Sequence, residues 1–206
     1  MTMKKKGFLV LIAAPSGGGK STICEEILRL NPDLCYSISW TTRAKRGKET
    51  DGINYFFTDT ATFQNKIEEG FFLEYAEVHG NFYGTSKSYV DDCLDNEKIV
   101  IFDIDVQGVE LIRNKGYDVV TIFILPPNQE VLKQRLLNRG TDSPEVIIQR
   151  LENARKEIDC IECYDYLVIN DEINKAIEIV NSILIGEKNK RNRYISPKED
   201  FYRKKK

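Results

Sequence analysis

The stretch from Phe8 to Thr22, FLVLIAAPSGGGKST, constrains the fold more than any other part of the chain. Its first part, Phe8 to Ala13, is a continuous apolar run that is too short to span a membrane and is typical of a buried parallel strand. The next residues match the phosphate-loop pattern G-x-x-x-x-G-K-[ST], except that Ala14 replaces the first glycine. They are Ala14, Pro15, Ser16, Gly17, Gly18, Gly19, Lys20 and Ser21. A helix should follow directly.

This loop predicts a site for nucleotide phosphates. Three successive glycines allow backbone N–H groups to converge on one anion, and the following helix adds its positive N-terminal end. Lys20 would reach the β- and γ-phosphates, and the Ser21 hydroxyl would face Mg²⁺. Alanine at position 14 is acceptable wherever φ is negative. A merely flexible Gly/Ser loop is the alternative, which the strand before it and the helix after it disfavour.

Length and charge limit the classes of protein to which the chain can belong. A chain of 206 residues suits one domain with insertions. With 30 Lys and Arg against 32 Asp and Glu, the net charge of −2 gives no global attraction to nucleic acid or membrane. Basic residues gather after Gly186, however, with nine Lys or Arg against three acids. We expect residues 187–206 to be a disordered or partner-ordered tail, with a nucleic-acid-binding arm as the less favoured alternative.

Several targeting and cofactor classes are disfavoured. The basic start, Met1 to Lys6, precedes an apolar run that leads into the phosphate loop rather than into a signal-peptide cleavage site, so a cytoplasmic protein is expected. Five cysteines, an odd number with irregular spacing, favour reduced thiols. Cys160-x-x-Cys163 has no second pair and no histidine nearby, so neither a zinc site nor a redox site is expected there.

Apolar strands alternate with amphipathic helices along the core, which we place at about 7–38, 87–125 and 166–186. Buried strands are predicted at 8–13, 98–102, 119–125 and 166–169, and helices at 21–30, 88–95, 130–138, 143–161 and 171–186. This alternation predicts an α/β fold: a parallel sheet of the P-loop NTPase type with helices on both faces.

Two stretches are predicted to lie outside the sheet: a small β-rich insertion at 39–86 and a helical lid at 126–165. For the insertion and its approach we predict strands at 35–42, 54–57 and 71–78, a helix capped by Thr58, and an aromatic turn at 80–86. Such a pair suits a kinase that must exclude water, since one stretch can hold the acceptor while the other closes over it. Asp103 and Asp105 end the second buried strand, where a metal-site carboxylate is expected.

Taken together, these motifs resemble the guanylate kinase family, which transfers the γ-phosphoryl group of ATP to GMP. The resemblance covers about residues 7–186 and rests on APSGGGKST, TTRAKRG, DGINYFF, FLEYAEVHGNFYGTS, IFDIDVQG, IFILPP, LLNRGTDSPEVIIQRL and YDYLVIND. It implies one guanylate kinase-like domain that converts GMP, and dGMP as well, with ATP and Mg²⁺ in purine nucleotide metabolism. Trp40 departs from the pattern, because the family usually has a small or polar residue there.

The resemblance implies a GMP site in the insertion. Two arginines of the TTR-x-x-R loop and two tyrosine hydroxyls would hold the phosphate, which suits forked guanidinium groups. Glu74 with hydroxyl partners would read guanine, whose N1 and N2 atoms donate hydrogen bonds, whereas adenine has the opposite polarity. The implied GMP-binding residues are Ser39, Arg43, Arg46, Tyr55, Glu74, Tyr83, Thr85 and Asp103.

On the ATP side, the resemblance implies binding by the phosphate loop, by Arg135 and by Asn170, the last near the adenine. The implied ATP-binding residues are Ala14, Pro15, Ser16, Gly17, Gly18, Gly19, Lys20, Ser21, Thr22, Arg135 and Asn170. Ser21 and Asp103 would hold Mg²⁺, directly or through water. The groups expected to stabilise the transferred phosphoryl group are Lys20, Arg43, Arg139 and Arg150.

Two alternatives stay open. Another nucleoside monophosphate kinase would share the phosphate chemistry, but Glu74 with its hydroxyl partners favours guanine. A non-catalytic scaffold module of the same fold binds phosphorylated peptides and has a damaged phosphate loop, whereas Gly19, Lys20 and Ser21 are intact here. A GTPase switch lacks support, because no N/T-K-x-D motif is present. The sequence does not decide between a monomer and a homo-oligomer.

Overall fold

A computed structural model describes residues 4–78, 80–138 and 144–202 of the chain. Its centre is a five-stranded parallel sheet with the strand order β2-β7-β1-β8-β9. The strands are β1 (Phe8–Ala13), β2 (Cys35–Tyr36), β7 (Ile99–Asp103), β8 (Val119–Leu125) and β9 (Tyr166–Ile169). Within the described residues, no helix is long and apolar enough to cross a bilayer.

Helices cover both faces of this sheet, because β1 buries its side chains on both sides. On one face Phe8, Val10 and Ile12 pack with α1 (Lys20–Leu30) and α7 (Ile173–Lys188). On the other face Leu9, Leu11 and Ala13 pack with α3 (Lys87–Asp95) and α4 (Val106–Arg113). The predicted parallel sheet covered on both faces is therefore confirmed, although helix α4 was not predicted.

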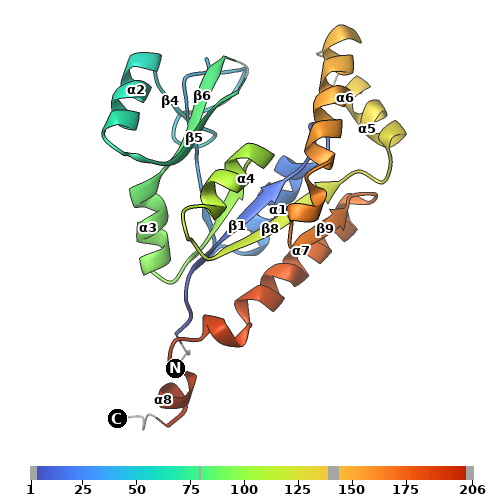
Figure 1. The fold of residues 1–206 in the computed structure, drawn as a ribbon. Coiled ribbons are helices and arrows are strands. Elements are labelled where there is room, and N and C mark those ends of the chain that lie inside the picture. The colour runs from blue at the N-terminus through green and yellow to red at the C-terminus, as the bar shows by residue number, and fades with distance from the viewer. Residues whose placement is uncertain (1–3, 79, 139–143, 203–206) are drawn as a thin grey trace.

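A second, smaller sheet has the order β4-β3-β6-β5 and carries α2 (Thr60–Glu68). Figure 1 shows it on one side of the molecule, while α5 (Gln129–Leu137) and α6 (Pro144–Ile158) project on the other side from the same end of the central sheet. The small sheet consists of β3 (Trp40–Thr41), β4 (Phe56–Phe57), β5 (Phe72–Val78) and β6 (Asn81–Ser86). Short 3₁₀ helices η1 (Ile161–Cys163) and η2 (Arg191–Arg193) and helix α8 (Pro197–Tyr202) complete the described elements.

The single strand predicted at 35–42 is wrong. The chain instead contributes β2 to the central sheet, where Tyr36 pairs with Ile101, and then β3 to the small sheet, where Trp40 pairs with Phe56 and Gly84. Alternation of side chains predicts an extended backbone but cannot show which sheet each part joins, because sheet partners are distant in sequence.

The aromatic turn predicted at 80–86 is also wrong, since these residues form β6, antiparallel to β5. Gly80, with φ of 74°, lies just before the strand, and Phe82 stacks on Phe63 at a ring distance of 5.4 Å. The cap of α2 is Asp59 rather than Thr58, because the Asp59 carboxylate accepts a hydrogen bond from Thr62 N at 2.8 Å.

The last strand and helix also differ in detail from the prediction. Strand β9 lies at the sheet edge, so Leu167 and Ile169 are about half exposed instead of buried. Helix α7 continues past Gly186 to Lys188.

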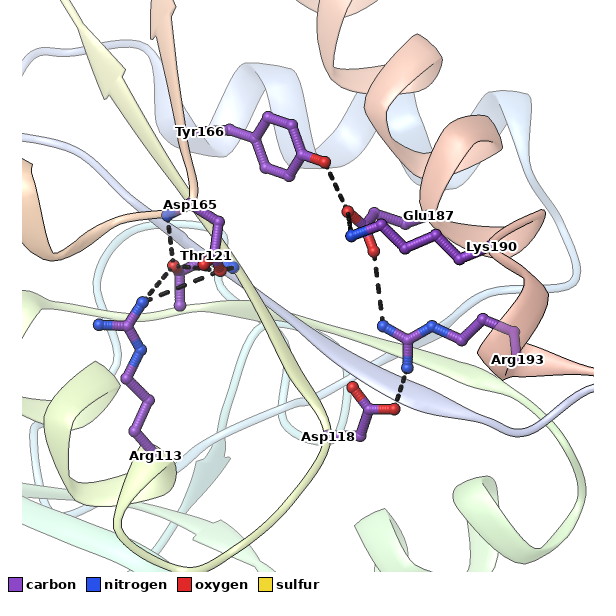
Figure 2. Close-up of polar contacts among 8 residues, drawn as sticks. All are labelled: Arg113, Asp118, Thr121, Asp165, Tyr166, Glu187, Lys190 and Arg193. Carbon is purple, nitrogen blue, oxygen red and sulfur yellow. Dashed lines mark hydrogen bonds and ion pairs between the residues drawn. The ribbon is translucent and has the colours of Figure 1, made fainter.

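Residues 187–195 pack onto the core, contrary to the predicted disorder, whereas Phe201 and Tyr202 of α8 are largely exposed. Arg193, only 3% exposed, forms ion pairs with Asp118 and Glu187, as Figure 2 shows. Glu187 also accepts hydrogen bonds from Tyr166 Oη at 2.5 Å and from Lys190 Nζ at 2.6 Å (Figure 2). Burial alone would raise the pKa of Glu187, but these donors lower it, so the Glu187 carboxylate is ionised. One basic residue of the tail, Arg193, is therefore buried, and its partners are buried Glu187 and half-exposed Asp118.

Candidate active site

Four strand ends of the central sheet converge on one region. The phosphate loop follows β1, Asp103 ends β7, and Asn170 follows β9 and donates its backbone N–H to Leu125 O at the end of β8. Ligands of open α/β sheets bind at the carboxyl ends of the strands, so this edge is the expected place for a site.

The phosphate loop has the conformation that its glycines allow. Gly17 and Gly19 have φ of 86° and 95°, values that side-chain-bearing residues rarely adopt, and Gly19 is the N-cap of α1. Ala14 has a negative φ, so its methyl group is tolerated in place of the first glycine. The Asn170 side-chain amide stabilises the loop by donating a hydrogen bond from Nδ2 to Gly18 O at 2.7 Å.

Lys20, the first residue of α1, is held by two acceptors at the end of β7. Its Nζ donates to Ile104 O at 3.1 Å and forms an ion pair with Asp103. Burial by itself would lower the pKa of Lys20, but the Asp103 carboxylate outweighs it, so the pKa is raised and the amine is charged.

Ser21 and Asp103 lie together, as predicted for the metal site, with Ser21 Oγ donating to Asp103 Oδ2 at 3.3 Å. A hydroxyl and a carboxylate are ligands that suit Mg²⁺. Across the described part of the chain, no group of three or more His, Cys, Asp or Glu side chains could hold a metal by itself. These residues therefore fit a Mg²⁺ ion whose remaining ligands are phosphate oxygens and water.

A cavity of about 240 Å³ brings most of the predicted GMP-binding residues together. The phosphate loop and the end of β7 line one wall, and the small sheet lines the other. The lining residues are Lys20, Ser39, Tyr55, Glu74, Ala76, Val78, Tyr83, Asp103, Ile104 and Asp105. Asp105 lines the cavity and also caps α4 by accepting from Gly108 N at 2.9 Å.

Glu74 is a buried carboxylate on the wall formed by β5. It is 9% exposed and lies opposite Thr85, whose hydroxyl hydrogen-bonds to it. Burial raises the pKa of Glu74 to about 7, and Asp105 adds to the rise. The sequence interpretation missed Ser37, whose hydroxyl donates to Thr85 Oγ1 at 3.5 Å. Its spacing of two from Ser39 in the extended segment could have indicated it.

Arg43 lies at the phosphate end of the predicted site and is 8% exposed. Its guanidinium lies 5.2 Å from the centre of the Tyr55 ring, and the Tyr83 hydroxyl is within hydrogen-bonding reach of it. Glu49, which the sequence interpretation missed, forms a two-point ion pair with Arg43. An acid three residues after Arg46 in a basic loop is the signal that could have indicated it. The Arg46 side chain is exposed and does not line the cavity.

On the ATP side, α5 packs against the phosphate loop, since a Cβ on Gly17 would meet Leu136 at 3.1 Å. Arg135 donates from Nη2 to Asn170 O at 2.9 Å, and its buried Nη1 has no partner among the described residues. Asn170 itself is 2% exposed beneath the loop. Arg150 is half-buried on α6, whereas Arg139 lies outside the described residues.

Comparison with known proteins identifies the family. The family model described as guanylate kinase matches residues 6–187. The chain belongs to the guanylate kinase family. It is 48% identical over 193 residues to a guanylate kinase of Myxococcus xanthus, covering 93% of this chain and 92% of the relative. It is 46% identical over 183 residues to one of Clostridium perfringens, covering 89% and 85%.

A solved structure agrees with the sequence relatives. The crystal structure of guanylate kinase from Anaplasma phagocytophilum superimposes with a TM-score of 0.79 at 31% identity, covering 96% of this chain and 94% of that one. The guanylate kinase match includes every residue of the cavity and ends at Glu187, the carboxylate that anchors the tail.

Proposed function

We propose that the chain transfers the γ-phosphoryl group of ATP to GMP, giving ADP and GDP. One observation carries this proposal: a single cavity joins Lys20 of the phosphate loop to Glu74 on the opposite wall. A donor phosphate on the loop and a guanine base on Glu74 would therefore belong to two substrates that meet inside one site.

GMP is proposed to bind across the small sheet. Ionised Glu74 accepts hydrogen bonds from guanine N1 and N2, with hydroxyl groups of Ser39 and Thr85 beside it. AMP lacks these donors and would leave the carboxylate unpaired, at a cost of about 1–3 kcal/mol or more. The GMP phosphate would lie against Arg43 and the hydroxyls of Tyr55 and Tyr83, with Arg46 reaching it from the surface. Because dGMP presents the same base and phosphate as GMP, it is expected to be a substrate as well.

ATP is proposed to bind along the phosphate loop. The loop N–H groups and Lys20 hold the β- and γ-phosphates, and Lys20 exchanges its contact with Asp103 for the phosphate oxygens. Mg²⁺ held by Ser21 and Asp103 would neutralise phosphate charge. Arg135 would contribute its unpartnered Nη1, and Arg150 and Arg139 would approach from α6 and the segment before it. Positioning and charge neutralisation account for most catalysis of phosphoryl transfer.

The segments 39–86 and 126–165 are proposed to act as the acceptor-binding insertion and the lid. Elements of the two segments project from the same end of the central sheet, α2 with the small sheet on one side of the molecule and α5 with α6 on the other (Figure 1). Closure of both segments would exclude water, which would otherwise compete with GMP for the phosphoryl group.

The test is ADP production from ATP and Mg²⁺ with GMP, dGMP, AMP, CMP and UMP offered in parallel. Turnover with the guanine nucleotides alone is expected. Turnover with a nucleotide of another base would still support a kinase but would refute the proposed role of Glu74 in guanine recognition. GMP binding without any turnover would favour a scaffold module instead.

A further inference from the structure

The phosphate loop begins with a turn from Pro15 to Gly18. A hydrogen bond from Gly18 N to Pro15 O at 2.7 Å closes the turn, and Ser16 and Gly17 occupy its two central positions. Because Gly17 has a φ of 86° at the second of these positions, the turn belongs to the type II class. The N–H of Ser16 takes no part in the closing hydrogen bond, so its partner has to come from outside the turn.

Helices α5 and α6 contact this turn at its two central residues. On α5, Leu132 and Leu136 lie against Gly17, where a Cβ would meet them at 3.3 and 3.1 Å. On α6, the Glu157 carboxylate is within hydrogen-bonding reach of the Ser16 N–H. The two helices also pack on each other through an apolar cluster that includes Leu132, Leu136, Ile147 and Ala154. These contacts couple the position of the two helices to that of the turn.

Glu157 lies in the interior, although it belongs to a helix with a charged outer face. Its Oε2 atom is buried and has no hydrogen-bond partner within residues 4–78, 80–138 and 144–202. The side chain borders a cavity of about 500 Å³, whose walls also include Val78 of β5 and Asp105 at the start of α4. Burial raises the pKa of Glu157 and Asp105 adds to the rise, while the Lys20 charge and the Ser16 N–H offset part of it. Burying a carboxylate oxygen without a donor costs stability, which argues for a role of Glu157 beyond folding.

We propose that Glu157 is a positioning residue for the donor substrate: it holds the Ser16 N–H and so fixes the phosphate loop to helix α6 in the arrangement that binds ATP. This inference rests on the proposed function, because the phosphates that the loop serves are those of ATP. Glu157 is not one of the described residues that line the cavity in which GMP is proposed to bind, so GMP binding should not depend on it.

The first experiment compares the affinities of the two substrates, each measured alone by calorimetry. Glu157→Ala is expected to weaken binding of ATP with Mg²⁺ by at least about tenfold, the effect of one hydrogen bond to a charged group, and to raise the KM for ATP similarly. The affinity and the KM for GMP should change less than about threefold. Glu157→Gln keeps an acceptor for the Ser16 N–H and should recover most of the ATP affinity. Glu152→Ala removes an exposed carboxylate from the same helix and should leave both affinities unchanged.

Thermal melting of the protein without ligand separates positioning from an effect on folding. Because Glu157→Gln removes a buried charge and keeps the acceptor, its melting temperature should equal or exceed that of the wild type. Equal weakening of ATP and GMP binding in Glu157→Ala, together with a lower melting temperature, would overturn the positioning role.

A variant of the other partner tests the contact itself. Ser16→Pro removes the N–H, and proline suits the first central position of a type II turn, so the turn should be kept. This variant should weaken ATP binding about as much as Glu157→Ala, and the double variant should bind ATP no more weakly than Ser16→Pro alone. Additive losses would contradict the contact. No ATP binding by the wild type would refute the proposed function, whereas unchanged ATP affinity in Glu157→Ala would refute this inference alone.

Discussion

Replacement of Glu74 by glutamine should stabilise the empty protein while weakening its binding of guanine. Burial raises the pKa of Glu74 from an ordinary value of 4.5 to about 7. The folded protein therefore binds the proton of the Glu74 carboxyl group more tightly than the unfolded chain does. The stability that this gives is fully present below pH 4.5 and is lost as the pH rises through 7. Glutamine keeps the side-chain shape but has no such dependence.

The magnitude follows from the rise in pKa. Each pH unit corresponds to about 1.4 kcal/mol, so the free energy of unfolding of Glu74→Gln relative to wild type should increase by about 2–3 kcal/mol between pH 5 and pH 8. Urea unfolding at both pH values measures this, with the fluorescence of Trp40, the chain's one tryptophan, as the signal. Glu77→Gln, an exposed position on the same strand, is the matched control.

Binding should change in the opposite sense. Guanosine avoids titration of the substrate phosphate, and its affinity for the wild type should fall about tenfold from pH 8 to pH 6 as Glu74 becomes protonated. The other titratable groups lining the cavity are Lys20, Tyr55, Tyr83, Asp103 and Asp105. Glu74→Gln should bind guanosine more weakly and with little pH dependence. An unchanged pH profile, or no relative stabilisation at pH 8, would refute the reasoning.

Three further substitutions test other parts of the structure. Lys20→Met should lower turnover by at least about a hundredfold while GMP affinity, measured by calorimetry, stays nearly constant; full turnover would exclude a role for the amine in transfer. Gly19→Ala would place a methyl group 2.3 Å from Asn170 Nδ2 at a φ of 95°, so thermal melting should show a loss of about 1–3 kcal/mol together with loss of ATP binding. An unaltered melting temperature would count against this loop geometry. Arg193→Ala would leave buried Glu187 without its arginine and should cost about 3 kcal/mol in urea unfolding with kcat unchanged. A drop in kcat at full stability would contradict the purely structural role of this cluster.

The sequence was sufficient where local pattern decides the structure. The strand Phe8–Ala13 and the glycine turn after it were predicted with the observed bounds, because an unbroken apolar run followed by φ-permissive residues has few other solutions. The GMP-binding residues were predicted by a different route, from the residue-by-residue resemblance to a family, and the structure brings five of the eight to one cavity: Ser39, Tyr55, Glu74, Tyr83 and Asp103.

The remaining errors concern partners that are distant in the chain or opposite in charge. The split of 35–42 between two sheets depends on which strands pair with Tyr36 and Trp40, and side-chain alternation does not encode this. Glu49 was overlooked because an acid in a basic loop has the composition of an ordinary solvated turn, and only the fold places it against Arg43. The tail was predicted to be a disordered or partner-ordered extension because it is basic and lies outside the family resemblance, but Arg193 pairs with Asp118 and Glu187 of the core.

The most direct measurement is a crystal structure of the protein with GMP and a non-hydrolysable ATP analogue. The account predicts that guanine N1 and N2 lie within hydrogen-bonding distance of the Glu74 carboxylate. It also predicts that the GMP phosphate binds Arg43 and the hydroxyls of Tyr55 and Tyr83. A base bound away from Glu74, or a GMP phosphate bound away from Arg43, would contradict it.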